Sequence, residues 1–385
     1  MKISFITRHN IINYGSILQA IALQEMIEKY GHEAEVIDYI RTDEDYRNIA
    51  KVLANRNSKW GRNPLLKFCF VVGKTLEFKI AEKNFEKIRG RYLKMSERYS
   101  TLTELKENPP EADVYMTGSD QVWGGIGQDR YDAAFFLDFG DLKKRRVSYA
   151  ASFGRTDMSE ELIEIYSDLL KNFSVISVRE ESAKEILINQ GYSDTLQVLD
   201  PTLLITAKEW DDIVNREDSS FRMPNIPYIL VYQRRPNKEI DRYVEKLSKH
   251  AGYPVYRITA DFHQRIRGGK MIFLPNMHEF IDWLKNATFI VTDSFHGTAF
   301  AINYNIDFVD ILPSGTATRN LSMLKLVGLS NRVVKEKNDF SFIENKIDFT
   351  VVNQILDNER QRSKQILKEM ITGEQEEYEY RSNNR

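Results

Sequence analysis

A histidine follows directly on an apolar segment in the second half of the chain. The segment FIVTDS (residues 289–294) is typical of a buried strand, and FHGTAFAI (295–302) is typical of a following helix. His296 is therefore expected where a strand ends and a helix begins, which is where anionic ligands bind in open α/β sheets. An imidazole in that place suits proton transfer to a substrate. Position alone equally allows a histidine that caps the helix.

Two neighbouring features fit an anionic ligand. Gly297, next to the histidine, would let a ligand approach the backbone closely. Arg179 follows the apolar run VISV (175–178), and a guanidinium group pairs bidentately with a carboxylate or a phosphate. The alternative for Arg179 is a surface arginine that pairs with Glu180 or Glu181.

The segment GSDQVW (118–123) follows another apolar run and carries three polar side chains, Ser119, Asp120 and Gln121. Their oxygens are suited to accept hydrogen bonds from sugar hydroxyls, and Trp123 is suited to stack on a pyranose ring. These residues are therefore candidates for binding a sugar. The alternative is an Asx-type turn that ends the strand.

Two further motifs are placed at element ends. NYGSILQA (13–20) puts Asn13 and Gly15 at the start of the first expected helix, where they cap that helix or contact a ligand; we rank capping first. Asp200, before a proline in VLDPTLL, is interpreted as an architectural residue at a strand exit.

Apolar runs of strand length alternate with helical periodicity along the chain. A strand at 2–7, a helix at 16–31 and a strand at 34–40 indicate a right-handed parallel crossover and an α/β sheet. Further strands are expected at 113–118, 145–152, 175–180 and 196–200, with a helix at 159–173. The second half repeats the alternation, with strands at 228–233, 254–259, 289–294 and 307–312.

The length of 385 residues favours two domains. The segment FRMPNIPY (221–228) holds two prolines before a new strand and marks the boundary. We expect two Rossmann-like domains that face each other across a cleft, as in GT-B glycosyltransferases. The N-terminal domain is placed at 1–222 and the C-terminal domain at 223–352; a charged helix and tail at 353–385 follow, and its last ten or so residues are expected to be frayed.

Charge is distributed unevenly. The net charge of −2 gives no general attraction to nucleic acid, so we expect no nucleic-acid partner. Residues 41–100, however, contain 15 Lys or Arg against 7 Asp or Glu, with interspersed aromatic residues. We interpret them as a basic helical insertion in the N-terminal domain. It either binds an anionic membrane surface or phosphorylated lipid headgroups, or is a solvated helical hairpin whose aromatics pack inward.

Several classes of protein are disfavoured. No segment approaches the roughly 20 apolar residues of a membrane span, and the N-terminus turns polar too early for a secretory signal. A single cysteine, Cys69, excludes an intrachain disulfide. We therefore expect a cytoplasmic protein, either free or peripheral at the inner face of the membrane. HExxH, GxGxxG and Walker motifs are lacking, so neither a metal site nor a cofactor is predicted.

Taken together, SFHGTAFAI, GSDQVW, SVREES (177–182), VLDPTLL and NYGSILQA resemble the polysaccharide pyruvyl transferase family, in the right order over roughly residues 3–335. The resemblance implies phosphoenolpyruvate as donor and a sugar of a cell-surface polysaccharide, or of its lipid-linked precursor, as acceptor. It also implies a two-domain glycosyltransferase-like fold, and a product that is a cyclic pyruvate ketal formed with release of phosphate.

The resemblance also implies roles for single residues. His296 is similar to the family's catalytic histidine, a general acid, and Arg179 to an arginine that holds the donor. Ser294, Phe295 and Gly297 are expected beside the donor, and Asn13 and Gly15, with the GSDQVW residues, on the acceptor side. Family members carry Arg-Leu-His where this chain has Ser294, Phe295 and His296. Either another cation replaces the missing arginine at the donor site or the donor differs. Arg319, in SGTATRN, is the candidate replacement; the alternative is an ordinary loop arginine.

Two other functions remain open on the same fold. The first is a GT-B-type glycosyltransferase that uses a nucleotide sugar, which the missing arginine favours. The second is a glycan-binding protein without catalytic turnover.

Overall fold

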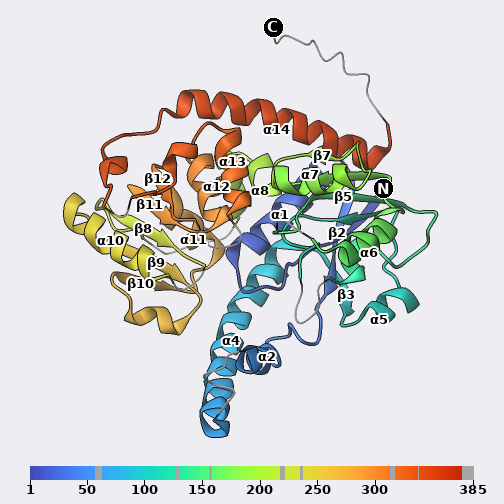
Figure 1. Cartoon of the computed structure of the whole chain (residues 1–385), viewed down its shortest axis with the longest axis horizontal. Coiled ribbons are helices and arrows are strands. Elements are labelled where there is room, and N and C mark those ends of the chain that lie inside the picture. The colour runs from blue at the N-terminus through green and yellow to red at the C-terminus, as the bar shows by residue number, and fades with distance from the viewer. Residues whose placement is uncertain are drawn as a thin grey trace.

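The computed structural model describes residues 1–56, 63–125, 131–155, 158–216, 222–234, 237–312, 317–336 and 338–374. These residues form two parallel sheets flanked by helices, side by side in one molecule (Figure 1). The first sheet lies within residues 2–197 and the second within 229–310, so the sheets fall on either side of the predicted boundary. The predicted fold class, α/β with two Rossmann-like domains, is confirmed.

The N-terminal sheet has seven strands in the order β3-β2-β1-β4-β5-β6-β7, and its strand pairs are parallel. The strands are β1 (Lys2–Ile6), β2 (Glu33–Tyr39), β3 (Met95–Tyr99), β4 (Val114–Thr117), β5 (Arg145–Ala151), β6 (Val175–Val178) and β7 (Leu196–Gln197). The helices around it are α1 (Tyr14–Lys29), α5 (Leu102–Glu107), α6 (Glu160–Leu170) and α7 (Glu181–Asn189).

The C-terminal sheet has five strands in the order β10-β9-β8-β11-β12, again parallel. The strands are β8 (Ile229–Tyr232), β9 (Val255–Thr259), β10 (Lys270–Phe273), β11 (Phe289–Thr292) and β12 (Phe308–Asp310). Its helices are α10 (Lys238–Ala251), α11 (Met277–Lys285), α12 (Phe295–Asn303) and α13 (Thr318–Leu326). Short 3₁₀ turns occur at η1 (Ala133–Phe136), η2 (Phe262–Ile266), η3 (Ser330–Arg332) and η4 (Ser341–Ile343).

One hydrophobic core joins the two domains. Buried apolar residues of both sheets belong to the same cluster, which runs from Phe5 in β1 to Leu230 in β8. At the junction the Tyr14 ring stacks on Phe280 with centroids 4.3 Å apart, and the Tyr14 hydroxyl donates to the Pro275 carbonyl oxygen at 2.6 Å. The domains are therefore held in register by apolar packing as well as by the chain connection.

Three helices also connect the domains. The short helices α8 (Pro201–Leu204) and α9 (Ala207–Val214) lead out of the first sheet, and α14 (Phe349–Thr372) returns across both domains (Figure 1). Within α14, the Arg360 guanidinium donates to the Leu203 carbonyl oxygen and to Asn303 Oδ1, both at 2.7 Å. The predicted frayed end at 375–385 lies outside the described residues.

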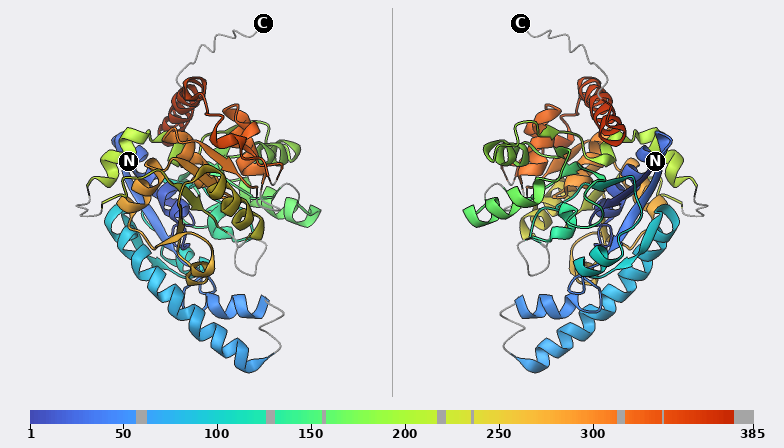
Figure 2. Two further views of the ribbon diagram at one scale, coloured as in Figure 1. Left: turned by 90° about the vertical axis from the view of Figure 1, so that its left-hand side faces the viewer. Right: turned by 90° about the vertical axis from the view of Figure 1, so that its right-hand side faces the viewer.

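The basic segment forms a helical hairpin and then rejoins the sheet as edge strand β3. Its helices α2 (Ile49–Arg56) and α4 (Pro64–Tyr92) project from the body of the molecule, as Figure 2 shows. Phe85, near the base of α4, is buried, whereas Phe68 is 66% exposed. The aromatic residues of the hairpin therefore do not all pack inward. Among the described helices, none combines the length and apolar character that a membrane span requires.

Candidate active site

The carboxyl ends of four central strands meet between the two domains. In each sheet the strand order reverses at one point, between β1 and β4 and between β8 and β11, and ligands of open α/β sheets bind at such points. The segments that follow these strands line a cavity of about 290 Å³, called here the central cavity. Its lining residues are Arg8, Ile11, Asn13, Ser16, Asp120, Gln121, Arg234, Asp293, Ser294, Phe295, His296 and Arg319.

His296 occupies the first turn of α12 and is 4% exposed. Its ring lies against α1, because a Cβ atom added to Gly15 would be 2.1 Å from His296 Nδ1. The structural alternative for the histidine is wrong: Ser294 caps α12, its hydroxyl oxygen accepting from the Gly297 N–H at 3.3 Å. His296 Nε2 is 3.7 Å from Asp200 Oδ2 and has no hydrogen-bond partner among the described residues.

Asp200 is the buried centre of this arrangement. Its Oδ2 accepts hydrogen bonds from Arg179 Nη1 at 2.8 Å and Ser119 Oγ at 2.9 Å, and its Oδ1 accepts from Thr202 Oγ1 at 2.7 Å. Burial alone would raise the pKa of Asp200, but His296 and Arg179 outweigh burial and hold it well below its usual range. Asp200 is therefore an ionised partner of the histidine, and the purely architectural interpretation missed this contact.

Arg179 is also buried, so its surface alternative is wrong. The Phe295 ring covers the guanidinium carbon at 4.3 Å, and Nη2 is 3.9 Å from Asp120 Oδ1. Burial alone would lower the pKa of Arg179, but the negative charges of Asp200, Glu180 and Asp120 outweigh burial and raise it. Arg179 is not one of the residues that line the central cavity. Its charge is held beside the cavity by Asp200.

Asp120 is an ionised carboxylate at the wall of the central cavity. Ser16 Oγ donates to Asp120 Oδ2 at 2.7 Å. Burial would raise the pKa of Asp120, yet the charges of Arg179 and His296 and this hydrogen bond lower it to about 2. Asp120 also has a φ of 78°, a strained conformation for a residue with a side chain, and such strain is common at functional sites.

Asn13 and Gln121 line the cavity as well. Asn13 is the N-cap of α1, as predicted, because its side chain accepts a hydrogen bond from the Gly15 N–H at 3.2 Å. Asn13 Oδ1 also accepts from the Tyr232 hydroxyl at 3.0 Å, which joins the two domains beside the cavity. Asn13, predicted as a cap or a ligand contact, and Asp120 and Gln121, predicted as sugar contacts, are therefore placed where they can touch a ligand.

Trp123 does not take the predicted position. Its side chain is fully buried, stacks on Phe136 and donates from Nε1 to the Phe135 carbonyl oxygen at 3.0 Å. The loop after β4 turns inward at this residue, so the indole is part of the hydrophobic core and cannot stack on a sugar. Ser119 is buried too, and its hydroxyl is used by Asp200.

Gly297 serves helix packing instead of ligand approach. A Cβ atom there would be 2.4 Å from Thr292 Oγ1 and 3.1 Å from a ring carbon of Tyr232. The glycine therefore lets α12 lie close to β11 and β8. This packing in turn fixes the position of the neighbouring His296.

Sequence reasoning missed three charged residues of the central cavity. Arg8 follows β1, Arg234 follows β8, and Asp293 follows β11 and accepts from the Arg234 backbone N–H at 2.7 Å. Their common signal is a charged residue directly after a central strand. With Arg319, the cavity has three arginines against two aspartates, which suits an anionic ligand next to the buried His296. Within the described ranges, no three His, Cys, Asp or Glu side chains gather as metal ligands would.

Comparison with known proteins supports the resemblance of the motifs. The sequence profile of the family described as polysaccharide pyruvyl transferase matches residues 13–312. No curated protein sequence matches the chain significantly.

Solved structures show similarity in fold. The UDP-GlcNAc 2-epimerase of Methanocaldococcus jannaschii superposes with a TM-score of 0.53 at 15% identity, covering 97% of this chain and 100% of the other. The Neisseria meningitidis UDP-GlcNAc 2-epimerase, solved bound to UDP-GlcNAc, gives a TM-score of 0.50 at 12% identity, covering 97% and 100%. At such low identity these similarities concern the fold alone.

The contact between His296 and Gly15 gives a testable expectation. A Gly15→Ala change should lower the melting temperature, because the new methyl group must displace the imidazole, and overpacking costs about 1–3 kcal/mol. In an open helical position the same change is stabilising by up to about 1 kcal/mol. Gly90→Ala in α4, where no atom lies within 4 Å of the added Cβ, is the matched control. Equal melting temperatures for the two variants would contradict the described packing.

Proposed function

We propose that this chain, which belongs to the polysaccharide pyruvyl transferase family, moves the enolpyruvyl unit of phosphoenolpyruvate onto a sugar. The product is a cyclic pyruvate ketal, and phosphate is released. The observation that carries the proposal is a buried histidine at an arginine-lined cavity between two facing switch points. Phosphoenolpyruvate has both a carboxylate and a phosphate, so it needs several fixed cations.

The donor is held by arginines from three segments. Arg8, Arg234 and Arg319 line the central cavity, and each can pair with a carboxylate or phosphate oxygen. Arg319 supplies the charge that other family members carry at the position of Ser294. Arg179 adds a fixed positive charge from beside the cavity, where Asp200 holds it.

His296 is proposed to act as the general acid. It protonates the methylene carbon of the donor, and one sugar hydroxyl attacks the resulting cationic carbon. Phosphate then leaves, and a second hydroxyl closes the ring. Of the two hydroxyl protons lost, one restores His296 and the other leaves with phosphate, so atoms and charges balance. Asp200 stabilises the imidazolium before transfer, and Asp120, with a pKa of about 2, orients a hydroxyl rather than acting as a base.

A nucleotide sugar is the second candidate donor. It is favoured by the missing arginine at Ser294 and by the fold shared with UDP-GlcNAc 2-epimerases. The two candidate reactions give different products. Only the pyruvyl transfer consumes phosphoenolpyruvate and releases inorganic phosphate when a sugar acceptor is present.

His296→Ala should lower ketal formation at least about 100-fold, because general acid catalysis contributes that much or more. Phosphoenolpyruvate affinity should stay close to that of wild type, since the donor is held by arginines. Ketal formation is followed by mass spectrometry on a panel of free and lipid-linked oligosaccharides. The control is His278→Ala on α11, outside the central cavity. More than about a tenth of wild-type turnover in His296→Ala would refute the role.

Donor binding is tested with two arginines. Arg319→Ala should weaken phosphoenolpyruvate binding about tenfold or more in calorimetry, because a charge-assisted hydrogen bond is lost. Arg179→Lys should weaken it too, since an ammonium cannot replace the guanidinium that pairs with Asp200. The control is Arg362→Ala on α14, where the side chain is 40% exposed. Unchanged affinity in both variants would show that neither Arg179 nor Arg319, which lies in the first turn of α13, takes part in donor binding.

A lipid-linked acceptor and peripheral membrane contact are part of the proposal. One face of α4, called here the outer stripe, consists of apolar side chains that are 43–70% exposed and three or four positions apart: Leu65, Phe68, Val72, Leu76 and Ile80. The exposed lysines Lys79, Lys83 and Lys87 continue the same face toward the body of the molecule. Apolar residues at the tip with lysines behind them suit an anionic membrane surface.

Charge reversal of Lys79, Lys83 and Lys87 to Glu should reduce co-sedimentation with phosphatidylserine-containing liposomes roughly tenfold or more at low salt, and the effect should shrink as salt rises. Phosphoenolpyruvate affinity should not change. Reversing Lys171, Lys249 and Lys325, which are exposed lysines on other helices or their ends, is the control. If wild-type protein does not co-sediment with these liposomes at low salt, the hairpin is a solvated helical hairpin without a role in membrane binding.

A further inference from the structure

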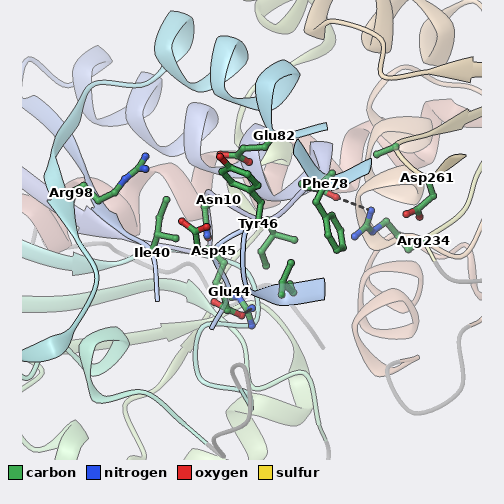
Figure 3. Close-up of a pocket in the computed structure, with 15 residues that line it drawn as sticks. Asn10, Ile40, Glu44, Asp45, Tyr46, Phe78, Glu82, Arg98, Arg234 and Asp261 are labelled. Atoms are coloured by element: carbon green, nitrogen blue, oxygen red, sulfur yellow. Dashed lines mark hydrogen bonds and ion pairs between the residues drawn. The ribbon is translucent and has the colours of Figure 1, made fainter. Parts of the chain in front are cut away.

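A second cavity of about 240 Å³ adjoins the central cavity and shares Arg8, Ile11 and Arg234 with it. Figure 3 shows the side chains around it, which come from the segments after β1 and β2, from the hairpin helices, from β3 and from the C-terminal domain. We propose that this second cavity binds a pyranose ring of the sugar acceptor. The inference rests on the proposed transfer reaction and assigns a location to the acceptor-binding part of the site.

The charge of the second cavity differs from that of the central cavity. Four carboxylates line it, those of Glu44, Asp45, Glu82 and Asp261. They outnumber its three arginines, and each has an ion-pair partner: Glu44 pairs with Arg8, Asp45 with Arg47, Glu82 with Arg89 and Asp261 with Lys74. Each carboxylate has acceptor sites beyond its ion pair, so a neutral polyhydroxylated ring finds acceptors for its hydroxyl hydrogens here. The central cavity, with three arginines against two aspartates, suits the anionic donor better.

Two aromatic rings supply the apolar contact that a sugar ring needs. Tyr46 and Phe78 line the second cavity and are half-buried, so their rings are held in place yet partly accessible. Ile40 and Ile49 extend the apolar wall. Ligand sites typically combine such apolar and aromatic walls with a few placed polar groups, and the C–H faces of a pyranose suit the aromatic surface.

The hairpin closes the cavity by bridging the domains. Lys74 Nζ on α4 donates to Asp261 Oδ1 at 2.9 Å, and Glu77 Oε1 accepts from the Phe262 N–H at 3.0 Å. Lys74 and Phe78 are therefore on the inner side of α4, away from the outer stripe.

The shared wall explains how an acceptor hydroxyl meets the donor. Because Arg8, Ile11 and Arg234 border both cavities, a ring in the second cavity lies next to a donor in the central cavity. We therefore place the acceptor site beside the hairpin instead of at the predicted GSDQVW loop, whose Trp123 side chain lies in the hydrophobic core. Asp120 and Gln121 remain at the wall of the central cavity and can contact only the reacting edge of the sugar.

Saturation-transfer NMR with three probes tests this inference: methyl β-D-galactopyranoside, methyl β-D-glucopyranoside and methyl α-D-mannopyranoside. At least one should give difference signals with wild-type protein, and Phe78→Ala and Tyr46→Ala should each reduce them severalfold. Phe70→Ala, a half-buried phenylalanine of α4 outside both cavities, is the matched control and should keep the signals. Two variants on different elements guard against a folding defect in one of them.

Phosphoenolpyruvate titrations on the same samples separate the two proposals. Glycoside binding that depends on Phe78 and Tyr46 supports the acceptor site, whether or not phosphoenolpyruvate binds. Failure of phosphoenolpyruvate to bind wild-type protein would count against the proposed reaction alone. No glycoside signal with wild-type protein, or equal signals in all variants, overturns the acceptor site.

Discussion

The buried carboxylate of Asp200 is the group on which the site depends. An ionised carboxylate without water is tolerated only with charged or hydrogen-bonding partners, and removing one partner of a buried pair typically costs about 3–5 kcal/mol. Arg179, Ser119 and Thr202 supply these partners from the N-terminal domain, and His296 approaches from the C-terminal domain. The same carboxylate therefore fixes the arginine beside the cavity and faces the histidine that we propose as the acid.

The packing of the two domains buries the Asp200 carboxylate and holds His296 close to it. The apolar core that is continuous from β1 to β8 sets the two switch points opposite each other, so four strand ends contribute to one cavity. Gly15 and Gly297 then allow α1, α12 and β11 to come close enough for the imidazole to touch α1. The hairpin adds an outer wall that the sheets alone do not provide. Charge divides the resulting space into a cationic part and a part richer in carboxylates.

Local patterns made much of this predictable. The alternation of apolar runs and helical periodicity placed the central strands of both domains and several of the helices, and a histidine between a strand and a helix marked the candidate site. Edge strands β3 and β10 were not predicted, because their sequences, MSERY and KMIF, are partly exposed and mix polar with apolar residues. Arg8 and Arg234 were not predicted as cavity residues. Which strand ends meet depends on the order of strands in the sheet, and local sequence does not determine that order. The path of a loop is equally hidden, which is why Trp123 was expected at a sugar and lies in the core.

A crystal structure of the protein soaked with phosphoenolpyruvate would locate the donor relative to His296. We expect the donor in the central cavity, with its carboxylate and phosphate against Arg8, Arg234 and Arg319 and its methylene carbon turned to His296. A parallel soak with UDP-GlcNAc should leave that position empty. Density for UDP-GlcNAc in the central cavity, with phosphoenolpyruvate absent from it at saturating concentration, would contradict the account.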